Sequence, residues 1–173
     1  MKRRTALKNV LLSATGLLTL PAWGNGWNAE FLKAGTSIFT KNQTQILDVL
    51  VDTLIPSSEI IGAKDLGTSA FIAKMLADCY QKNMQENFKI GLENTDKLAN
   101  EIFAKSLLDC DKIQRTELLL KLSTAADTTQ KEFFTRLKQL TVLAYTSSEY
   151  VLTKHYNYVM APGHYHGCVN VAP

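Results

Sequence analysis

Beyond residue 40, apolar and polar residues alternate with the spacing of amphipathic helices. Between residues 41 and 54 the apolar positions fall on one helical face and are Ile46, Leu47, Leu50, Val51 and Leu54. Thr40, with Gln43 three residues later, has the pattern of a capping box at the start of this helix. Pro56 ends the helix, because the residue before a proline is driven out of helical geometry.

The same spacing predicts further helices over residues 69–83, 85–108, 111–124 and 129–145, with a short helical turn over 148–152. The expected buried positions are Phe71, Met75, Leu76, Cys79 and Tyr80 in the first of these, and Phe133, Phe134, Leu137, Leu140 and Leu143 in the 129–145 helix. Gly91 is expected to weaken the helix that contains it. No stretch alternates convincingly with the period of a strand.

These elements predict an all-α fold with a single domain. We expect a helical bundle of about five helices over residues 40–155. An irregular, aromatic-rich C-terminal tail follows over residues 156–173. A lead-in segment over residues 25–39 precedes the bundle.

The first 24 residues have the pattern of an export signal. A basic start is followed by an apolar run from Val10 to Leu20, which is too short to span a bilayer comfortably but is typical of a signal peptide. The pair Arg3 and Arg4 resembles a twin-arginine signal. A Sec signal and an uncleaved anchor are the alternatives. We expect a periplasmic or cell-envelope protein, exported through the twin-arginine translocase and cleaved near Asn25.

The charge distribution gives no reason to expect a nucleic-acid partner. The chain of 173 residues has a formal net charge of +3, but four of its basic residues lie in the leader, which contains no acidic residue. Without the leader, 15 basic residues face 16 acidic ones. A nucleic-acid-binding domain would instead carry a basic patch.

The stretch from 161 to 168, APGHYHGC, carries the most chemistry in the chain. His164, His166 and Cys168 are weak candidates for a zinc or copper site, because two imidazoles and a thiolate suit these metals. The other interpretation is a tail that docks on a partner, directed by the turn at Pro162 and Gly163. The residues expected to take part in docking are Tyr158, Pro162, Gly163, Tyr165 and Cys168.

No catalytic or cofactor-binding motif occurs elsewhere: there is no Walker loop, no GxGxxG, no GxSxG and no HExxH. We therefore assign no catalytic residue and no cofactor to this chain. Of the three cysteines, Cys79 and Cys110 are expected to be buried, Cys168 is expected to be accessible, and their pairing stays open. Five of the six tyrosines follow residue 144, and they either pack on the bundle or form a contact surface.

Three parts of the chain together resemble the gluconate 2-dehydrogenase subunit 3 family: the leader, residues 50–76 and residues 133–168. The motifs that carry the resemblance are Asp52-Thr53-x-Ile55-Pro56, Gly62-Ala63, Gly67, Phe71-Ile72 and Pro162-Gly163-x-x-x-Gly167-Cys168. The sequence departs from the family pattern at Thr68, where valine is usual, and at Ile60-Ile61, where Thr-Pro is frequent.

The resemblance implies a small, non-catalytic subunit of an exported flavin-dependent dehydrogenase. The FAD would lie in a large partner subunit similar to the glucose–methanol–choline oxidoreductases, and a haem-bearing cytochrome c would be a further partner. The small subunit would carry the export signal for the complex. A stand-alone exported metal-binding protein, using His164, His166 and Cys168, is the alternative that the residues themselves leave open.

Overall fold

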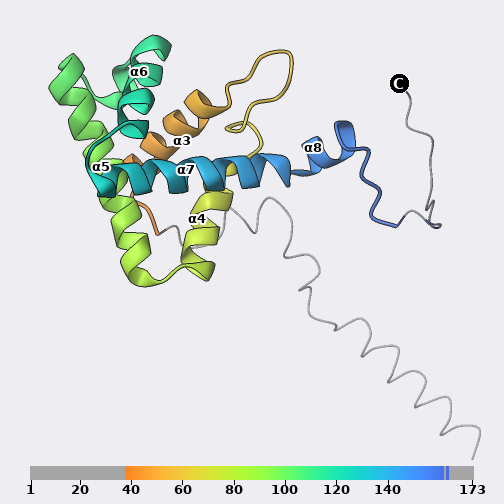
Figure 1. Cartoon of the computed structure of the whole chain (residues 1–173). Helices are drawn as coiled ribbons and strands as arrows, with labels where there is room; N and C mark the ends of the chain where they lie inside the picture. Colours follow the sequence, from red (N-terminus) through yellow and green to blue (C-terminus); the bar gives the residue numbers. More distant parts are fainter. Residues whose placement is uncertain (1–37, 162, 164–173) are drawn as a thin grey trace, which may run out of the picture. The chain divides into compact units, whose positions relative to one another are not determined.

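Six α-helices and one 3-10 helix make up the described part of the chain, which in the computed structural model comprises residues 38–161 and 163 (Figure 1). In chain order they are α3 (Lys41–Leu54), α4 (Thr68–Cys79), α5 (Lys82–Phe103), η2 (Leu107–Asp109), α6 (Lys112–Ser123), α7 (Thr128–Thr146) and α8 (Glu149–Lys154). The predicted all-α bundle is confirmed. The expected short turn near residue 150 is the helix α8. The leader and most of the lead-in segment lie outside the described residues.

Helix α3 is the central element of the bundle. It packs against α4, α5, η2, α6 and α7, and its apolar face is fully enclosed at Leu47, Leu50 and Val51. The predicted capping box is present. The Thr40 hydroxyl accepts a hydrogen bond from the Gln43 amide at 3.2 Å, and the Gln43 side chain accepts one from the Thr40 amide at 3.0 Å. Reciprocal caps of this kind satisfy amides that the first helical turn leaves without partners.

Gly91 has a packing role that the sequence pattern did not show. A Cβ atom at this position would lie 2.2 Å from a ring carbon of Phe133, so only glycine lets the Phe133 ring lie against the backbone of α5. Phe133 also makes an edge-to-face contact with Phe88, with 5.1 Å between ring centroids. Glycine lowers the intrinsic helix propensity of α5, but here it permits the close approach of α5 and α7.

The predicted helix over residues 85–108 is wrong at both ends. Helix α5 begins at Lys82 and ends at Phe103, where Ala104 adopts a left-handed conformation with φ of 52°. One Asp96 carboxylate oxygen accepts hydrogen bonds from the Leu107 amide at 2.8 Å and the Ser106 hydroxyl at 2.9 Å. These bonds hold the sharp turn into η2 and replace the helical bonds that the chain gives up.

Three further boundary and burial predictions are corrected. Helix α4 ends at Cys79 rather than at residue 83, because Tyr80 is extended and its carbonyl accepts a hydrogen bond from the Gln85 side chain at 2.9 Å. Cys79, expected to be buried, is exposed at this end of the helix. Leu143, expected in the core, is 47% exposed, because the neighbouring positions Leu140, Thr141 and Ala144 carry the buried face of α7.

Candidate functional site

Only two of the predicted docking residues, Tyr158 and Gly163, lie within the described part of the chain. Tyr158 is 52% exposed. Gly163 has φ of +76°, the left-handed conformation for which glycine was expected at this turn. The other candidates named from the sequence lie outside the described residues and stay predictions: Arg3, Arg4, Pro162, His164, Tyr165, His166 and Cys168.

The direction in which the tail leaves the bundle is set by Asn157. This residue has φ of 50° and stands just after α8. Around it, the Tyr156 amide donates to the Val151 carbonyl at 3.2 Å and the Tyr158 amide donates to the Leu152 carbonyl at 2.9 Å. Left-handed asparagine is a known way to end a helix. Asn157 was not among the residues predicted from the sequence, although an asparagine shortly after a helical stretch was a usable signal.

Beyond α8 the chain presents a nearly continuous run of exposed apolar side chains. We call residues 156–161 the tail segment, and all of them are exposed. The exposed fractions are 65% for Tyr156, 52% for Tyr158, 62% for Val159 and 87% for Met160. Contiguous exposed apolar surface on a folded protein is typical of a binding site for another macromolecule.

A second exposed apolar feature lies on the loop between α3 and α4. Ile60 and Ile61, which we call the loop patch, are 43% and 41% exposed. The loop that carries them is closed at its base, because the Ala63 amide donates to the Ile55 carbonyl at 3.0 Å. From the sequence alone, these isoleucines stood out only as a departure from a family pattern. Two adjacent isoleucines in a polar, glycine-bounded loop were a usable signal.

The interior of this loop is organised around Ser57. Its hydroxyl accepts a hydrogen bond from the Gly62 amide at 3.0 Å and donates one to the Asp65 carboxylate. A Cβ atom at residue 62 would lie 2.5 Å from the Ser57 amide nitrogen, so the loop closes tightly only around glycine. The loop patch is therefore presented on a preorganised backbone.

The tyrosines divide between the two interpretations made from the sequence. Tyr145 on α7 packs against the hydrophobic core, and its hydroxyl donates to the Ile61 carbonyl at 3.1 Å, which ties the loop to α7. Tyr150 is half-buried and makes an edge-to-face contact with His155. Tyr156 and Tyr158 are mostly exposed. Packing therefore accounts for Tyr145 and Tyr150, and for the exposed Tyr156 and Tyr158 the contact surface stays a prediction.

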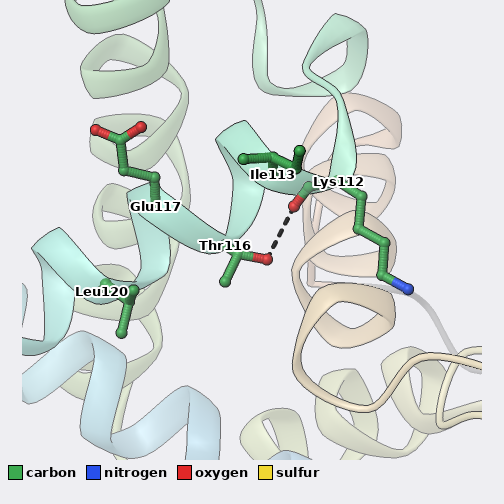
Figure 2. Close-up of a pocket in the computed structure, with 5 residues that line it drawn as sticks. All are labelled: Lys112, Ile113, Thr116, Glu117 and Leu120. Atoms are coloured by element: carbon green, nitrogen blue, oxygen red, sulfur yellow. Dashed lines mark hydrogen bonds between the residues drawn. The ribbon is translucent and has the colours of Figure 1, made fainter.

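Helix α6 carries a third exposed apolar surface. Figure 2 shows Ile113 and Leu120 on this helix together with Lys112, Thr116 and Glu117. Ile113 is 79% exposed and Leu120 is 62% exposed. A hollow of about 530 Å³ lies along these five residues. Among the described residues a single helix lines it, so it is an open surface rather than an enclosed cavity.

The described residues also bear on metal and thiol chemistry. Within residues 38–161 and 163, no group of three or more His, Cys, Asp or Glu side chains is placed to hold a metal ion.

Cys110 is buried, and its thiol donates a hydrogen bond to the Ser106 carbonyl at 3.4 Å. Burial raises the pKa of this thiol, and the nearby charges of Arg115 and Lys105 act in the opposite direction. Neither Cys110 nor Cys79 is in a disulfide. A raised thiol pKa disfavours the reactive thiolate, so Cys110 serves packing.

Over the portion of the chain that the structure describes, no helix combines the length and the apolar composition needed to span a bilayer.

Comparison with known proteins gives one match. The sequence model of the family described as Gluconate 2-dehydrogenase subunit 3 matches residues 41–163. The match covers all the described helices and ends at Gly163, before His164, Tyr165, His166 and Cys168. Searches of curated proteins and of solved structures gave no match. Since the family match spans well over half of the 173 residues, the chain belongs to the gluconate 2-dehydrogenase subunit 3 family.

Proposed function

We propose that this chain is the non-catalytic small subunit of an exported FAD-dependent dehydrogenase. The partner would be of the glucose–methanol–choline type and would oxidise a sugar or a sugar acid. The small subunit supports the export, maturation and stability of that flavoprotein. The observation that carries the proposal is the family match over residues 41–163, since the family is one of dehydrogenase subunits.

The FAD belongs to the partner in this proposal, and a cytochrome c is a third subunit that accepts the electrons. The Arg3-Arg4 leader provides the route, because a twin-arginine translocase carries folded cargo with its cofactor already bound. The complex then resides in the periplasm or on the cell envelope. The leader pattern and the family membership together support this location.

Exposed apolar surface supports a docking role for particular parts of the chain. The C-terminal part of α7 connects the loop patch with the tail segment. Tyr145 on α7 donates a hydrogen bond to the Ile61 carbonyl, and α8, which follows α7, leads into the tail segment. Figure 1 shows the loop after α3 and the chain after α8 at the same end of α7. Obligate interfaces bury apolar area, and aromatic side chains dominate their binding energy. We assign dehydrogenase binding to these two features.

The test is purification of the tagged chain from its native cell envelope, with identification of the proteins that accompany it. We expect a flavoprotein, recognised by its absorbance spectrum and its dehydrogenase activity. A preparation of the chain alone, with no flavoprotein and no loss of dehydrogenase activity in a deletion strain, would contradict the proposal.

Paired variants locate the docking surface. The double variant Ile60→Asp/Ile61→Asp places charge on the loop patch and should reduce co-purification strongly, because a buried, unpaired carboxylate is costly. The matched control is Ile113→Asp/Leu120→Asp, which makes the same change on the exposed face of α6. We expect the control to retain the flavoprotein. If the α6 variant instead loses the flavoprotein and the loop variant retains it, the dehydrogenase binds at α6.

A further inference from the structure

A small hollow between α4, α5 and α7 is not part of the docking features described above. Its volume is about 110 Å³, and its main lining residues are Leu76, Tyr80, Met84, Phe88, Phe133 and Arg136. The rings of Phe88 and Phe133 are 3% and 6% exposed and meet edge to face, with 5.1 Å between their centroids. The hollow therefore has an aromatic floor that is held in place by the core.

The edge of the hollow carries a cation that has no acidic partner among the described residues. The Arg136 guanidinium lies over the Tyr80 ring, 5.4 Å from the ring centroid, and Arg136 is half-buried. None of the ion pairs in the described part of the chain includes Arg136. Glu132, one turn earlier on α7, also lines the hollow, but it is exposed. A guanidinium stacked on a ring is held in place, and its N–H groups remain available to a carboxylate.

The size of the hollow decides what it can hold. Pockets for cofactors and other drug-sized ligands measure roughly 300–1,000 Å³, so 110 Å³ is too small for such a molecule. A cavity of about 150 Å³ encloses one benzene molecule, so the hollow is of the right size for a single aromatic side chain that enters from one side. The edge-to-face pair of Phe88 and Phe133 favours an aromatic occupant, because a third ring can extend this packing.

The hollow and the loop patch lie along the same helix. Phe133 in the hollow and Tyr145, which bonds to the Ile61 carbonyl, both belong to α7 and are about 18 Å apart along its axis. Between them, Leu143 is 47% exposed and lies about two turns from Arg136 on the same helical face. An interface of standard size covers about 800 Å² on each partner, which is roughly 30 Å across. One partner that covers the loop patch can therefore also cover the hollow.

On the basis of the function proposed above, we propose that the hollow receives one aromatic side chain of the dehydrogenase, and that a carboxylate beside this side chain pairs with Arg136. The partner's ring packs on Phe88 and Phe133 and closes the hollow. The carboxylate accepts charge-assisted hydrogen bonds from the guanidinium, and the ring shields these bonds from water. An aromatic anchor in a pocket beside an arginine has the composition of an interface hot spot.

Photocrosslinking in the whole complex tests which side chain enters the hollow. Asn87 lines the hollow and is exposed, so p-benzoylphenylalanine in its place leaves the aromatic floor intact. On irradiation of the co-purified complex, we expect residue 87 to crosslink to the flavoprotein, at or next to an aromatic residue that mass spectrometry identifies. The same amino acid in place of Ile113, on the exposed face of α6, is the matched control and should give no crosslink to the flavoprotein.

Two variants at the edge of the hollow test the sign of the partner's charge. Arg136→Gln removes the cation and should shorten the lifetime of the complex about tenfold, because the partner's covered carboxylate loses its counter-charge. Glu132→Gln removes the opposite charge one turn away on α7 and is the matched control. Its complex should live as long as that of the unaltered chain or longer, because Glu132 repels an incoming carboxylate. Surface plasmon resonance measures the lifetimes, and circular dichroism verifies that each variant is folded.

Co-purification of the flavoprotein without any crosslink from residue 87 would overturn this inference and leave the proposed function standing. A crosslink from residue 87 to another part of the same chain would also overturn it, because the hollow would then be occupied internally. An unchanged lifetime in folded Arg136→Gln, or equal shortening by Glu132→Gln, would show that no carboxylate of the partner pairs with Arg136. A chain that carries no flavoprotein at all would instead contradict the proposed function itself.

Discussion

The loop between α3 and α4 and the tail segment both expose apolar side chains, but the two are held in place to very different degrees. The loop is closed by the Ala63–Ile55 backbone bond, by Ser57 in its interior and by Tyr145 from α7. The tail segment is attached to α8 by two amide hydrogen bonds, and all its residues are exposed.

This difference separates two ways of contributing to an interface. A preorganised loop loses little conformational entropy on binding. Most of the free energy gained by burying even a small apolar patch therefore stabilises the complex. A tail must lose backbone and side-chain freedom when it docks, and it offsets that loss with a larger apolar area. We therefore expect the loop to set the orientation of the partner and the tail to set the lifetime of the complex.

Deleting residues 156–173 should produce the largest effect on the complex. It removes Met160, the apolar side chain with the largest exposed fraction among the described residues, and we expect the lifetime of the complex with the dehydrogenase to fall at least about tenfold, which corresponds to about 1.4 kcal/mol. Surface plasmon resonance measures the lifetime. The thermal unfolding midpoint of the isolated chain should be unchanged, because the deleted described residues are exposed.

A truncation after Ala161 is the matched control for this deletion. It keeps the tail segment and removes His164, Tyr165, His166 and Cys168. If this shorter truncation has the whole effect, the distal residues form the contact. If neither truncation changes the lifetime, the comparison between loop and tail fails.

Gly62→Val should have the second largest effect, because it breaks the loop. The new side chain would collide with Ser57, and we expect the free energy of unfolding to fall by about 1–3 kcal/mol, with weaker dehydrogenase binding as the loop patch is displaced. Urea denaturation measures the stability. The control Gly67→Ala meets no atom within 4 Å and costs only the left-handed backbone strain of about 1 kcal/mol. Equal binding losses in the two variants would show that loop geometry is not what matters.

Tyr145→Phe tests the link between the loop and α7 more gently. It removes the hydrogen bond to the Ile61 carbonyl and keeps the ring, so the free energy of unfolding should fall by about 0.5–1.5 kcal/mol. Urea denaturation again provides the measurement. The association rate with the dehydrogenase should fall if the loop sets the orientation of the partner, and an unchanged rate would argue against that role.

Asn157→Ala should have the smallest effect. Alanine in the left-handed conformation costs about 1 kcal/mol more than asparagine or glycine at the end of α8. Hydrogen exchange at the Tyr158 amide should speed up, while global unfolding stays the same because the change is local. Asn157→Gly should preserve the protection of that amide. Equal protection in both variants would show that backbone strain does not fix the tail.

The sequence predicted the elements of the fold well where the apolar spacing and the caps agreed. Helix α3 has the predicted bounds, because Thr40 and Gln43 form the cap and Pro56 closes the other end. The sequence pattern could not predict the break after Phe103. That break depends on Asp96, whose carboxylate accepts hydrogen bonds from residues about one helix turn beyond the end of α5. Helical spacing alone does not show such a contact.

For the candidate site, the docking role of the tail stays a prediction. The left-handed turn at Gly163 was anticipated from residue type, whereas the sequence left burial and exposure of Tyr158 open and the structure shows it exposed. The loop patch was missed, because the exposure of Ile60 and Ile61 results from a closed loop that only the Ser57 and Tyr145 contacts reveal. The role of Gly91 was missed for the same reason, since its partner Phe133 is 42 residues away in the sequence.

The central position of α3 has a consequence for the order of synthesis. Lys41–Leu54 is the first of the described helices to leave the ribosome, yet its apolar face is covered in part by α7, which ends at Thr146. At about 5–20 residues per second, the interval between the two is roughly 5–20 s. During this time the buried face of α3 is without its full set of partners. We expect a ribosome-associated chaperone to bind α3 in that interval.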